Sequence, residues 1–315
     1  MANIVIRLAS EADLPAVKEV SEDVYGGHDY FLGEFLNFLN DPNRRVFIAE
    51  MDGKVVGLRA MHIIDEGETV IGHSLRVHYK KRCQGIGTRL VQESRNYVKA
   101  KFPQVKFERY ATHTVERLSI LRKSDDVQFH EAGLFECLVN ADVSKLSPRL
   151  ASYSTEQITD LKLLNKTELE RILNQDKLRK ISLKGKYIGI REPIHAIASN
   201  ITNGLFKDGD TMLASYSGES VESLSNSRWC KTLTCPHLMS VCYTLDKQLL
   251  KIHLVKQLEQ AIQQHSGEMF TFALMIDISL VECTTEFLFK NLSLKKSRDG
   301  VKAYDNYYFF EKSMQ

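Results

Sequence analysis

The sequence predicts a mixed α/β protein, α+β-like in part, built from two halves. Three observations carry this prediction. Strand-forming and amphipathic helical segments alternate along the first half, a polar serine-containing stretch at 145–160 interrupts them, and the same order of elements returns after residue 238. The chain has 315 residues, of which 43% are apolar, so we expect two domains with buried cores, at 1–148 and 160–315.

The first half begins with a short strand and two helices. A hairpin is then expected where two β-rich runs flank Asp52-Gly53, a favoured pair for a tight turn. A strand–helix–strand crossover and a closing strand follow it. The expected strands cover 3–10, 45–64 (the hairpin), 69–77, 105–112 and 131–140, and the expected helices cover 10–25, 31–40, 85–101 and 114–124.

The second half repeats the final part of this order. Between 163 and 230 the pattern is weak, apart from a helix at 165–174 and a glycine-punctuated loop or hairpin after it. Strands are then expected at 238–245, 269–277 and 306–313, with helices at 247–264 and 281–292. The two halves share an order of elements without matching residues.

The charge and cysteine content exclude several classes of protein. Lys and Arg total 42 and Asp and Glu total 40, so the chain lacks the basic excess of a general nucleic-acid or membrane-surface binder. Cys230, Cys235 and His237 only weakly resemble a zinc cluster, because no close Cys pair occurs, and we expect free thiols and no metal. With no secretory signal and no apolar run of about 20 residues, a cytoplasmic location is expected.

The segment 82–88 follows the strand at 69–77 and opens a helix with two residues that disfavour helices. The first N–H groups of a helix have no partners and carry partial positive charge, so an anion can bind there to backbone alone. Gly85 and Gly87 would let that anion approach closely, and basic residues at 80–82 add charge. The pattern predicts a diphosphate cradle. A dinucleotide fold would instead need G-x-G-x-x-G after the first strand of a βαβ unit.

The strand "VIGHSLRV" followed by Arg82-x-x-Gly85-x-Gly87 resembles the acyl-CoA-binding signature of the GNAT N-acyltransferase superfamily. The resemblance in element order covers residues 3 to about 140. It implies acetyl-CoA as co-substrate, with pyrophosphate contacts at Arg82, Gln84, Gly85, Ile86, Gly87 and Thr88. The amides of Leu75 and Val77 would contact the pantetheine arm, and the Val77 N–H would face the thioester oxygen as an oxyanion donor.

A second resemblance covers most of the chain. "VYGGHDYF", "LNDPNRRVFIAEMDGKVVGLRAMHIIDEGETV" and "LRV" resemble the vertebrate histidine N-acetyltransferase family and its uncharacterised N-acetyltransferase relatives, which also carry an additional C-terminal half. This implies acetyl transfer to the α-amine of a small-molecule acceptor, free L-histidine or a similar small amino acid. Two alternatives stay open: acetylation of protein N-termini or lysines, and a non-catalytic acyl-CoA-binding module.

The strand at 69–77 supplies a candidate base. Alternation of side chains predicts Ile71, His73, Leu75 and Val77 on one face. His73 is the titratable group of that face, ~13 Å from Val77 at the rise of a strand, which suits a base acting directly or through water. The alternative is a strand histidine that only satisfies a hydrogen-bond partner.

The segment 25–30 lies where GNAT proteins often cover the acceptor. Two glycines permit unusual backbone geometry, and the polar aromatics and the aspartate could hold an imidazole and an ammonium, so the expected contacts are Tyr25, Gly26, Gly27, Asp29 and Tyr30. GNAT enzymes commonly reprotonate the leaving thiolate with a tyrosine. Residues 115–129 contain none, only Lys123 or Ser124 near that place, so Tyr25 or Tyr30 is the expected substitute and Tyr110 a further candidate.

The second half contains no equivalent of the glycine loop. If it is a second GNAT-like unit, it lacks the cofactor loop, and its expected role is to form one wall of the acceptor site and to stiffen the first half. Residues 1–150 alone are therefore predicted to be poorly soluble.

Overall fold

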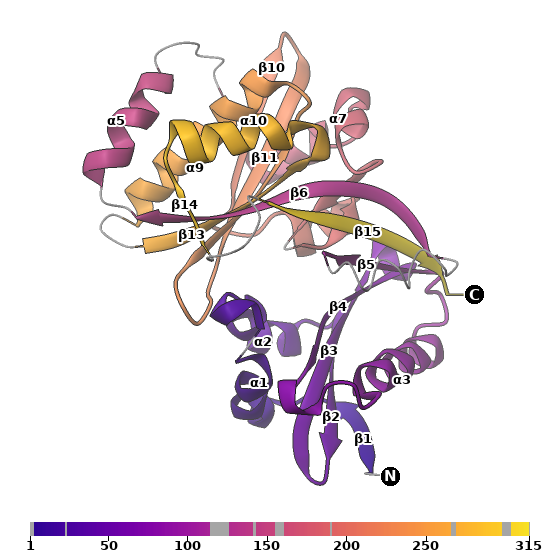
Figure 1. Ribbon diagram of the computed structural model, residues 1–315. Coiled ribbons are helices and arrows are strands. Elements are labelled where there is room, and N and C mark those ends of the chain that lie inside the picture. The colour runs from indigo at the N-terminus through magenta and orange to yellow at the C-terminus, as the bar shows by residue number, and fades with distance from the viewer. Residues whose placement is uncertain are drawn as a thin grey trace.

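The computed structural model describes residues 3–22, 24–113, 126–140, 143–154, 161–189, 191–265, 269–297 and 304–314. Within these ranges thirteen strands form one continuous sheet that runs through both halves of the molecule (Figure 1). Its main path is β1-β2-β3-β4-β5-β15-β6-β13-β12-β11-β10-β7. The predicted mixed α/β class is confirmed. The helix predicted at 114–124 lies outside the described residues.

The first half is an antiparallel meander followed by a parallel crossover. Residues Asp52 and Gly53 both have positive φ, 53° and 74°, and make the predicted tight turn of the hairpin. Helices α1 and α2 cover one face of the sheet, and α3 covers the other (Figure 1). The elements are β1 (Ile4–Leu8), α1 (Leu14–Ser21), α2 (Phe31–Asn40), β2 (Arg44–Met51), β3 (Lys54–Ile64), β4 (Thr69–Val77), α3 (Ile86–Lys101) and β5 (Phe107–Thr112).

The second half repeats this order. A meander leads through helix α9 to a strand that pairs in parallel, as β4 leads through α3 to β5. The matching elements are β7 (Lys162–Leu163), α6 (Lys166–Ile172), α7 (Asp176–Ile181), β10 (Thr211–Ser217), β11 (Ser220–Cys230), β12 (His237–Tyr243), α9 (Lys247–Gln264) and β13 (Met269–Asp277). Further elements are α5 (Val143–Ser154), β8 (Lys186–Ile188), β9 (Pro193–His195), α8 (Ala198–Asn200), α10 (Val281–Thr285) and β14 (Lys295–Lys296).

The hairpin β10–β11 and the short helix α7 were not expected from the sequence. Alternation along β11 is hidden because its buried face carries serines. Ser223 and Ser225 are fully buried, and their hydroxyls lie 2.7 Å from the two ring nitrogens of His253 on α9. Burial lowers the pKa of His253 to about 3, so the ring stays neutral between its two hydroxyl partners.

The two halves exchange their last strands. β15 (Asp305–Ser313), near the C-terminus, lies between β5 and β6, and β6 (Val127–Asn140) lies between β15 and β13. The closing strand expected at 131–140 therefore exists but does not pair with β5. Phe309 and Phe310 of β15 are buried on opposite faces of this junction. Strand pairing thus crosses the predicted domain boundary, whose position stays a prediction.

Residues 1–150 produced alone would leave β5 without β15, and β6 without its partners β13, β14 and β15. Long unpaired strand edges promote association, so we expect this fragment to aggregate, as measured by size-exclusion chromatography and sedimentation. Co-expression with residues 151–315 supplies the missing strands and should return a soluble complex. A monomeric fragment that unfolds cooperatively on its own would contradict this account.

Candidate functional site

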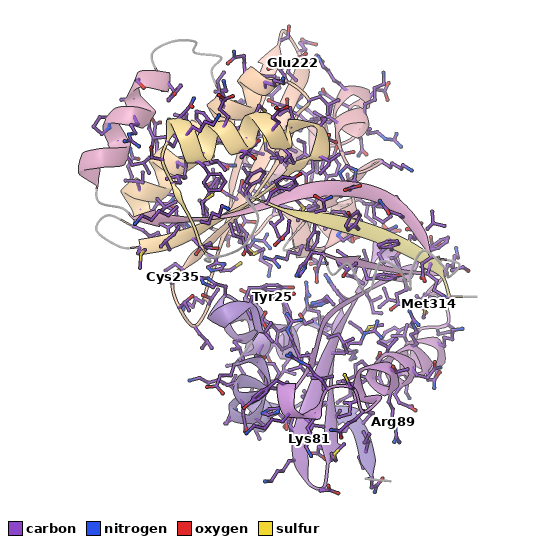
Figure 2. All side chains as sticks on the ribbon, viewed as in Figure 1. Tyr25, Lys81, Arg89, Glu222, Cys235 and Met314 are labelled. Carbon is purple, nitrogen blue, oxygen red and sulfur yellow. The ribbon has the colours of Figure 1, made fainter. Side chains whose placement is uncertain are left out.

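Strands β4 and β5 separate near the middle of the sheet. They pair only from Thr69↔Phe107 to Ile71↔Arg109, after which β5 pairs with β15 alone. A cavity of about 160 Å³ occupies this opening. The residues that line it come from both halves: Tyr25, Tyr30, Arg59, 71–76 of β4, 110–113 at the end of β5, Arg191 and Tyr307. Figure 2 places Tyr25 at this junction between the halves.

A β-bulge reorients the second part of β4. Leu58 pairs with Arg76 and Ala60 with His73, so two residues of β4 oppose the single residue between them on β3, and Ser74 has a φ of 53°. The prediction of one shared face along β4 is therefore wrong. Ile71 and His73 lie on the side of α2, whereas Leu75 and Val77 pack towards α3.

The start of α3, where the sequence predicts a diphosphate cradle, is a helix end preceded by a left-handed glycine. Gly85 has a φ of 77° and precedes the helix, and the first hydrogen bond within the helix runs from Arg89 N to Gly85 O at 3.0 Å. The amides at 86–88 consequently have no carbonyl partner inside the helix. Gln84 and Thr88 are exposed beside them, and the Arg82 Nε donates to Val77 O at 3.1 Å. The geometry suits an anion bound by backbone.

The corresponding helix end in the second half already holds an anionic group. Asp246 precedes α9, and its Oδ1 accepts hydrogen bonds from the amides of Gln248 and Leu249 at 2.7 and 3.0 Å. A carboxylate of the chain thus satisfies the amides that a phosphate would need. This agrees with the predicted lack of a second cofactor loop.

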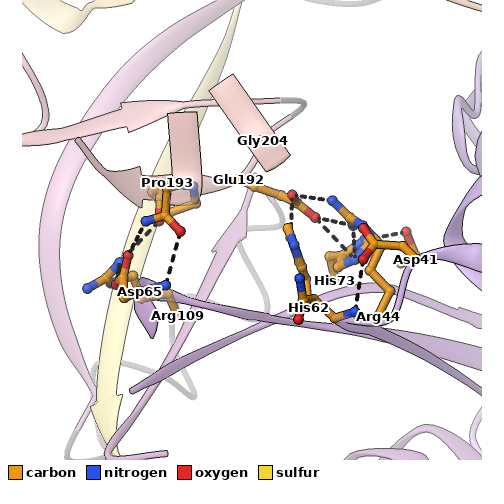
Figure 3. Close-up of polar contacts among 12 residues, drawn as sticks. Asp41, Arg44, His62, Asp65, His73, Arg109, Glu192, Pro193 and Gly204 are labelled. Atoms are coloured by element: carbon orange, nitrogen blue, oxygen red, sulfur yellow. Dashed lines mark hydrogen bonds and ion pairs between the residues drawn. The ribbon is translucent and has the colours of Figure 1, made fainter. Parts of the chain in front are cut away.

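The two halves meet through a buried carboxylate, Glu192 (Figure 3). It receives hydrogen bonds from Arg44 at 2.7 and 2.8 Å and lies 2.9 Å from the Nδ1 of His62 and 3.3 Å from the Nε2 of His73. Burial alone would raise the pKa of Glu192, but the charge of Arg44 and the bond to His62 hold that pKa well below its usual range. The carboxylate therefore stays ionised inside the protein.

His73 lines the cavity, but both of its ring nitrogens have neighbours. Its Nδ1 lies 3.0 Å from Ser74 Oγ, and its Nε2 lies 3.3 Å from Arg44 Nη1. Burial lowers the pKa of His73 to about 3, although the charge of Glu192 opposes the shift. The imidazole is neutral at neutral pH and is a weak proton acceptor.

The segment 25–30 divides into residues that face the cavity and residues behind it. Tyr25 and Tyr30 line the cavity, and burial raises the pKa of Tyr30, so its phenol keeps its proton. Asp29 instead accepts two hydrogen bonds from Arg76, both at 3.0 Å, and one from the amide of Phe31 at 3.2 Å. The predicted contacts Gly26, Gly27 and Asp29 are not among the described residues that line the cavity.

Two residues of the second half that line the cavity, Arg191 and Tyr307, were not predicted. The adjacent charges of Arg191 and Glu192, between Gly189 and Pro193, can be noticed in the sequence. Their role cannot be inferred from it, because the partner of Glu192, Arg44, lies far away along the chain. Tyr110 also lines the cavity and stacks on Phe310 at 5.6 Å. Lys123 and Ser124 lie outside the described residues.

The cysteine segment contributes a polar contact between the halves. Cys235 and His237 lie with His28 of the first half so that one ligand atom from each falls within 4.8 Å of the others. The Nδ1 of His28 is 2.8 Å from the Nε2 of His237, a hydrogen-bond distance, and Leu233 N donates to Gly27 O at 3.2 Å. Cys230 lies apart, in the core beneath α1 and α2. These contacts fasten segment 25–30 to the β11–β12 hairpin.

The chain matches two family models. One, described as Acetyltransferase (GNAT) family, matches residues 14–117, and the other, described as Histidine N-acetyltransferase, C-terminal, matches residues 157–277. A histidine N-acetyltransferase from Oreochromis niloticus is 29% identical over 71% of this chain and 68% of its own length. One from Scomber australasicus is 27% identical over 71% and 68% of the two chains.

Solved structures show the same fold over the whole chain. A GCN5-related N-acetyltransferase from Sphaerobacter thermophilus has a TM-score of 0.56 at 11% identity, covering 99% of this chain and 96% of that one. A tandem GNAT protein from the clavulanic acid biosynthesis pathway has a TM-score of 0.55 at 11% identity, covering 100% and 99%. The prediction of two GNAT-like halves is confirmed. Of the described helices, none is long and apolar enough to cross a membrane.

Replacing Glu192 by Ala should strongly destabilise the protein. The change leaves Arg44 buried without its main partner, and breaking such a pair costs about 3–5 kcal/mol of unfolding free energy. The matched control is Glu222→Ala, which removes an ion pair with the half-exposed Lys177 and should cost about 0–1 kcal/mol. Urea unfolding measures the free energy of unfolding of both variants. Equal losses for the two variants would show that Glu192 does not anchor the halves.

Proposed function

Because residues 14–117 match the GNAT acetyltransferase family and residues 157–277 match the C-terminal region of histidine N-acetyltransferases, we propose that the protein moves the acetyl group of acetyl-CoA to the α-amine of free L-histidine or a similar small amino acid. One observation carries the proposal: a helix end whose first amides have no partner inside the helix and an opened strand edge lie on the same strand–helix unit as a small cavity lined by both halves. The names of the relatives support the choice of histidine.

The cradle would hold the diphosphate of acetyl-CoA. The amides of Ile86, Gly87 and Thr88 would bind its oxygens, with Arg82, Gln84 and Gly85 beside them. His78 N donates to Val56 O on β3, so the amide before it, that of Val77, points to the opposite edge of β4. Along that open edge Leu75 and Val77 would contact the pantetheine arm.

The cavity residues would then carry the proton transfers. The neutral amine attacks the thioester carbon, and the Val77 N–H stabilises the charge that develops on the thioester oxygen. The attacking nitrogen loses a proton, which we assign to a relay through the Ser74 hydroxyl and the neutral His73 ring, 3.0 Å apart, that passes the proton on to solvent, because the buried His73 is too weak a base to keep it. Tyr25 or Tyr30 would donate the proton that the departing thiolate takes up.

The small volume of the cavity, about 160 Å³, favours a small acceptor over a protein. Arg191 and Tyr307 of the second half contribute to its lining, and the contacts of His28 and Gly27 hold segment 25–30 against the β11–β12 hairpin. A peptide acceptor needs a groove through which its chain can leave. The second half would thus act by completing the acceptor site.

An acceptor survey tests the proposal. The protein is mixed with acetyl-CoA, a chromogenic thiol reagent, and each of the twenty amino acids or a panel of peptides. We expect coenzyme A release with L-histidine at a kcat/KM at least about 100-fold above that for the peptides. Release with peptides alone would contradict the acceptor assignment. Tight binding of coenzyme A with no release for any acceptor would favour a non-catalytic binding module.

Gly87→Ala tests the cradle separately. A methyl group at Gly87 would meet Val77 and Leu75 at 3.7 and 3.9 Å, which are ordinary contacts, so the variant should fold with an unfolding free energy equal to or up to about 1 kcal/mol above wild type. The same methyl group would keep the diphosphate from the amides, and we expect coenzyme A affinity to fall about 10-fold or more in calorimetry. Glu93→Ala, exposed on the same helix, is the control. Unchanged affinity in Gly87→Ala would place the diphosphate elsewhere.

A further inference from the structure

Among the described residues, one buried cation of the second half lines the cavity with a donor that has no hydrogen-bond partner. Arg191 lines the cavity, and its side chain is 9% exposed. A guanidinium has five N–H donors, of which Nη2 donates to Glu136 at 3.1 Å, while the buried Nε has no partner among the described residues. Burying such donors without acceptors is costly, so the position is unusual for a purely structural arginine.

The surroundings of Arg191 are suited to an anionic group. The rings of Tyr25, Tyr30 and Tyr307 lie 5.8, 5.8 and 5.9 Å from its guanidinium carbon and enclose it. Of the other arginines that line the cavity, Arg76 is bound by both carboxylate oxygens of Asp29, and Arg59 donates to Val91 O, Ser94 and Glu108. Among the described arginines of the cavity wall, Arg191 is the one whose buried Nε has no partner.

The backbone holds this side chain in place. Arg191 has a φ of 57°, a conformation that non-glycine residues adopt only when their surroundings impose it. The next residue, Glu192, is bonded to Arg44 and contacts His62. Arg191 therefore lies beside the buried contact that joins the halves, and its own Nη2 is bonded to Glu136.

From these observations we infer that Arg191 binds the α-carboxylate of the acceptor and makes the enzyme specific for free α-amino acids. The inference rests on the proposed function, because it concerns the acceptor of the same site. A free α-amino acid carries a carboxylate whose carbon is two bonds from the amine nitrogen. A simple amine has no carboxylate there, and a peptide N-terminus has an amide at that position. Arginine is well suited to carboxylates because its planar donors match their geometry.

A comparison of L-histidine with histamine, which lacks the carboxylate, tests the inference. For wild type we expect kcat/KM to be about 100-fold higher with L-histidine than with histamine, because the carboxylate of L-histidine then pairs with the buried Arg191. In Arg191→Gln the value for L-histidine should fall about 100-fold, while the value for histamine changes less than about 3-fold. Arg171→Gln, exposed on α6, is the control and should behave as wild type.

Two outcomes would overturn the inference while leaving acetyl transfer intact: equal use of both acceptors by wild type, or an equal loss for both acceptors in Arg191→Gln. A binding measurement distinguishes a failure of this inference from a failure of the proposed function. If neither acceptor is acetylated, L-histidine is tested for a rise in melting temperature in the presence of coenzyme A. A rise in wild type that Arg191→Gln abolishes supports the carboxylate site, and the absence of any rise overturns it.

Discussion

The contact between Glu192 and Arg44 is the constraint on which the rest of the site depends. A carboxylate of the second half lies buried against an arginine at the start of β2 and two histidines of β3 and β4. Separating the halves would leave these buried charges without compensation, so the contact opposes other placements of the halves. In the observed placement Arg191 and Tyr307 line the cavity at the opening between β4 and β5.

The strand exchange makes this placement part of the fold rather than a docking of two finished domains. Because β15 lies between β5 and β6, the sheet of the first half ends on a strand from the far end of the chain. The two halves contribute different features to the candidate site. The helix end of the first half has amides without a partner inside the helix, whereas in the second half the matching helix end is capped by Asp246, and Arg191 and Tyr307 of that half line the cavity.

Features set by local physics could be predicted from the sequence. The helix end at Gly85 and the turn at Asp52-Gly53 follow from neighbouring residues, and so does the repeated order of elements. Features set by contacts between residues far apart in the sequence could not be predicted. The bulge at Ser74 breaks an otherwise regular alternation, and the buried serines of β11 are explained only by His253 on another element. Arg44 and Glu192 are 148 residues apart, so nothing near either one reveals that residues of the second half line the cavity.

A structure of the protein crystallised with coenzyme A and L-histidine tests the central claim most directly, namely that both halves form one site through the Glu192 anchor. The account predicts diphosphate oxygens against the amides at 86–88, the amine of histidine near the open edge of β4, and its carboxylate within hydrogen-bond distance of Arg191. A histidine bound entirely by residues of the first half, or outside the cavity between β4 and β5, would contradict it.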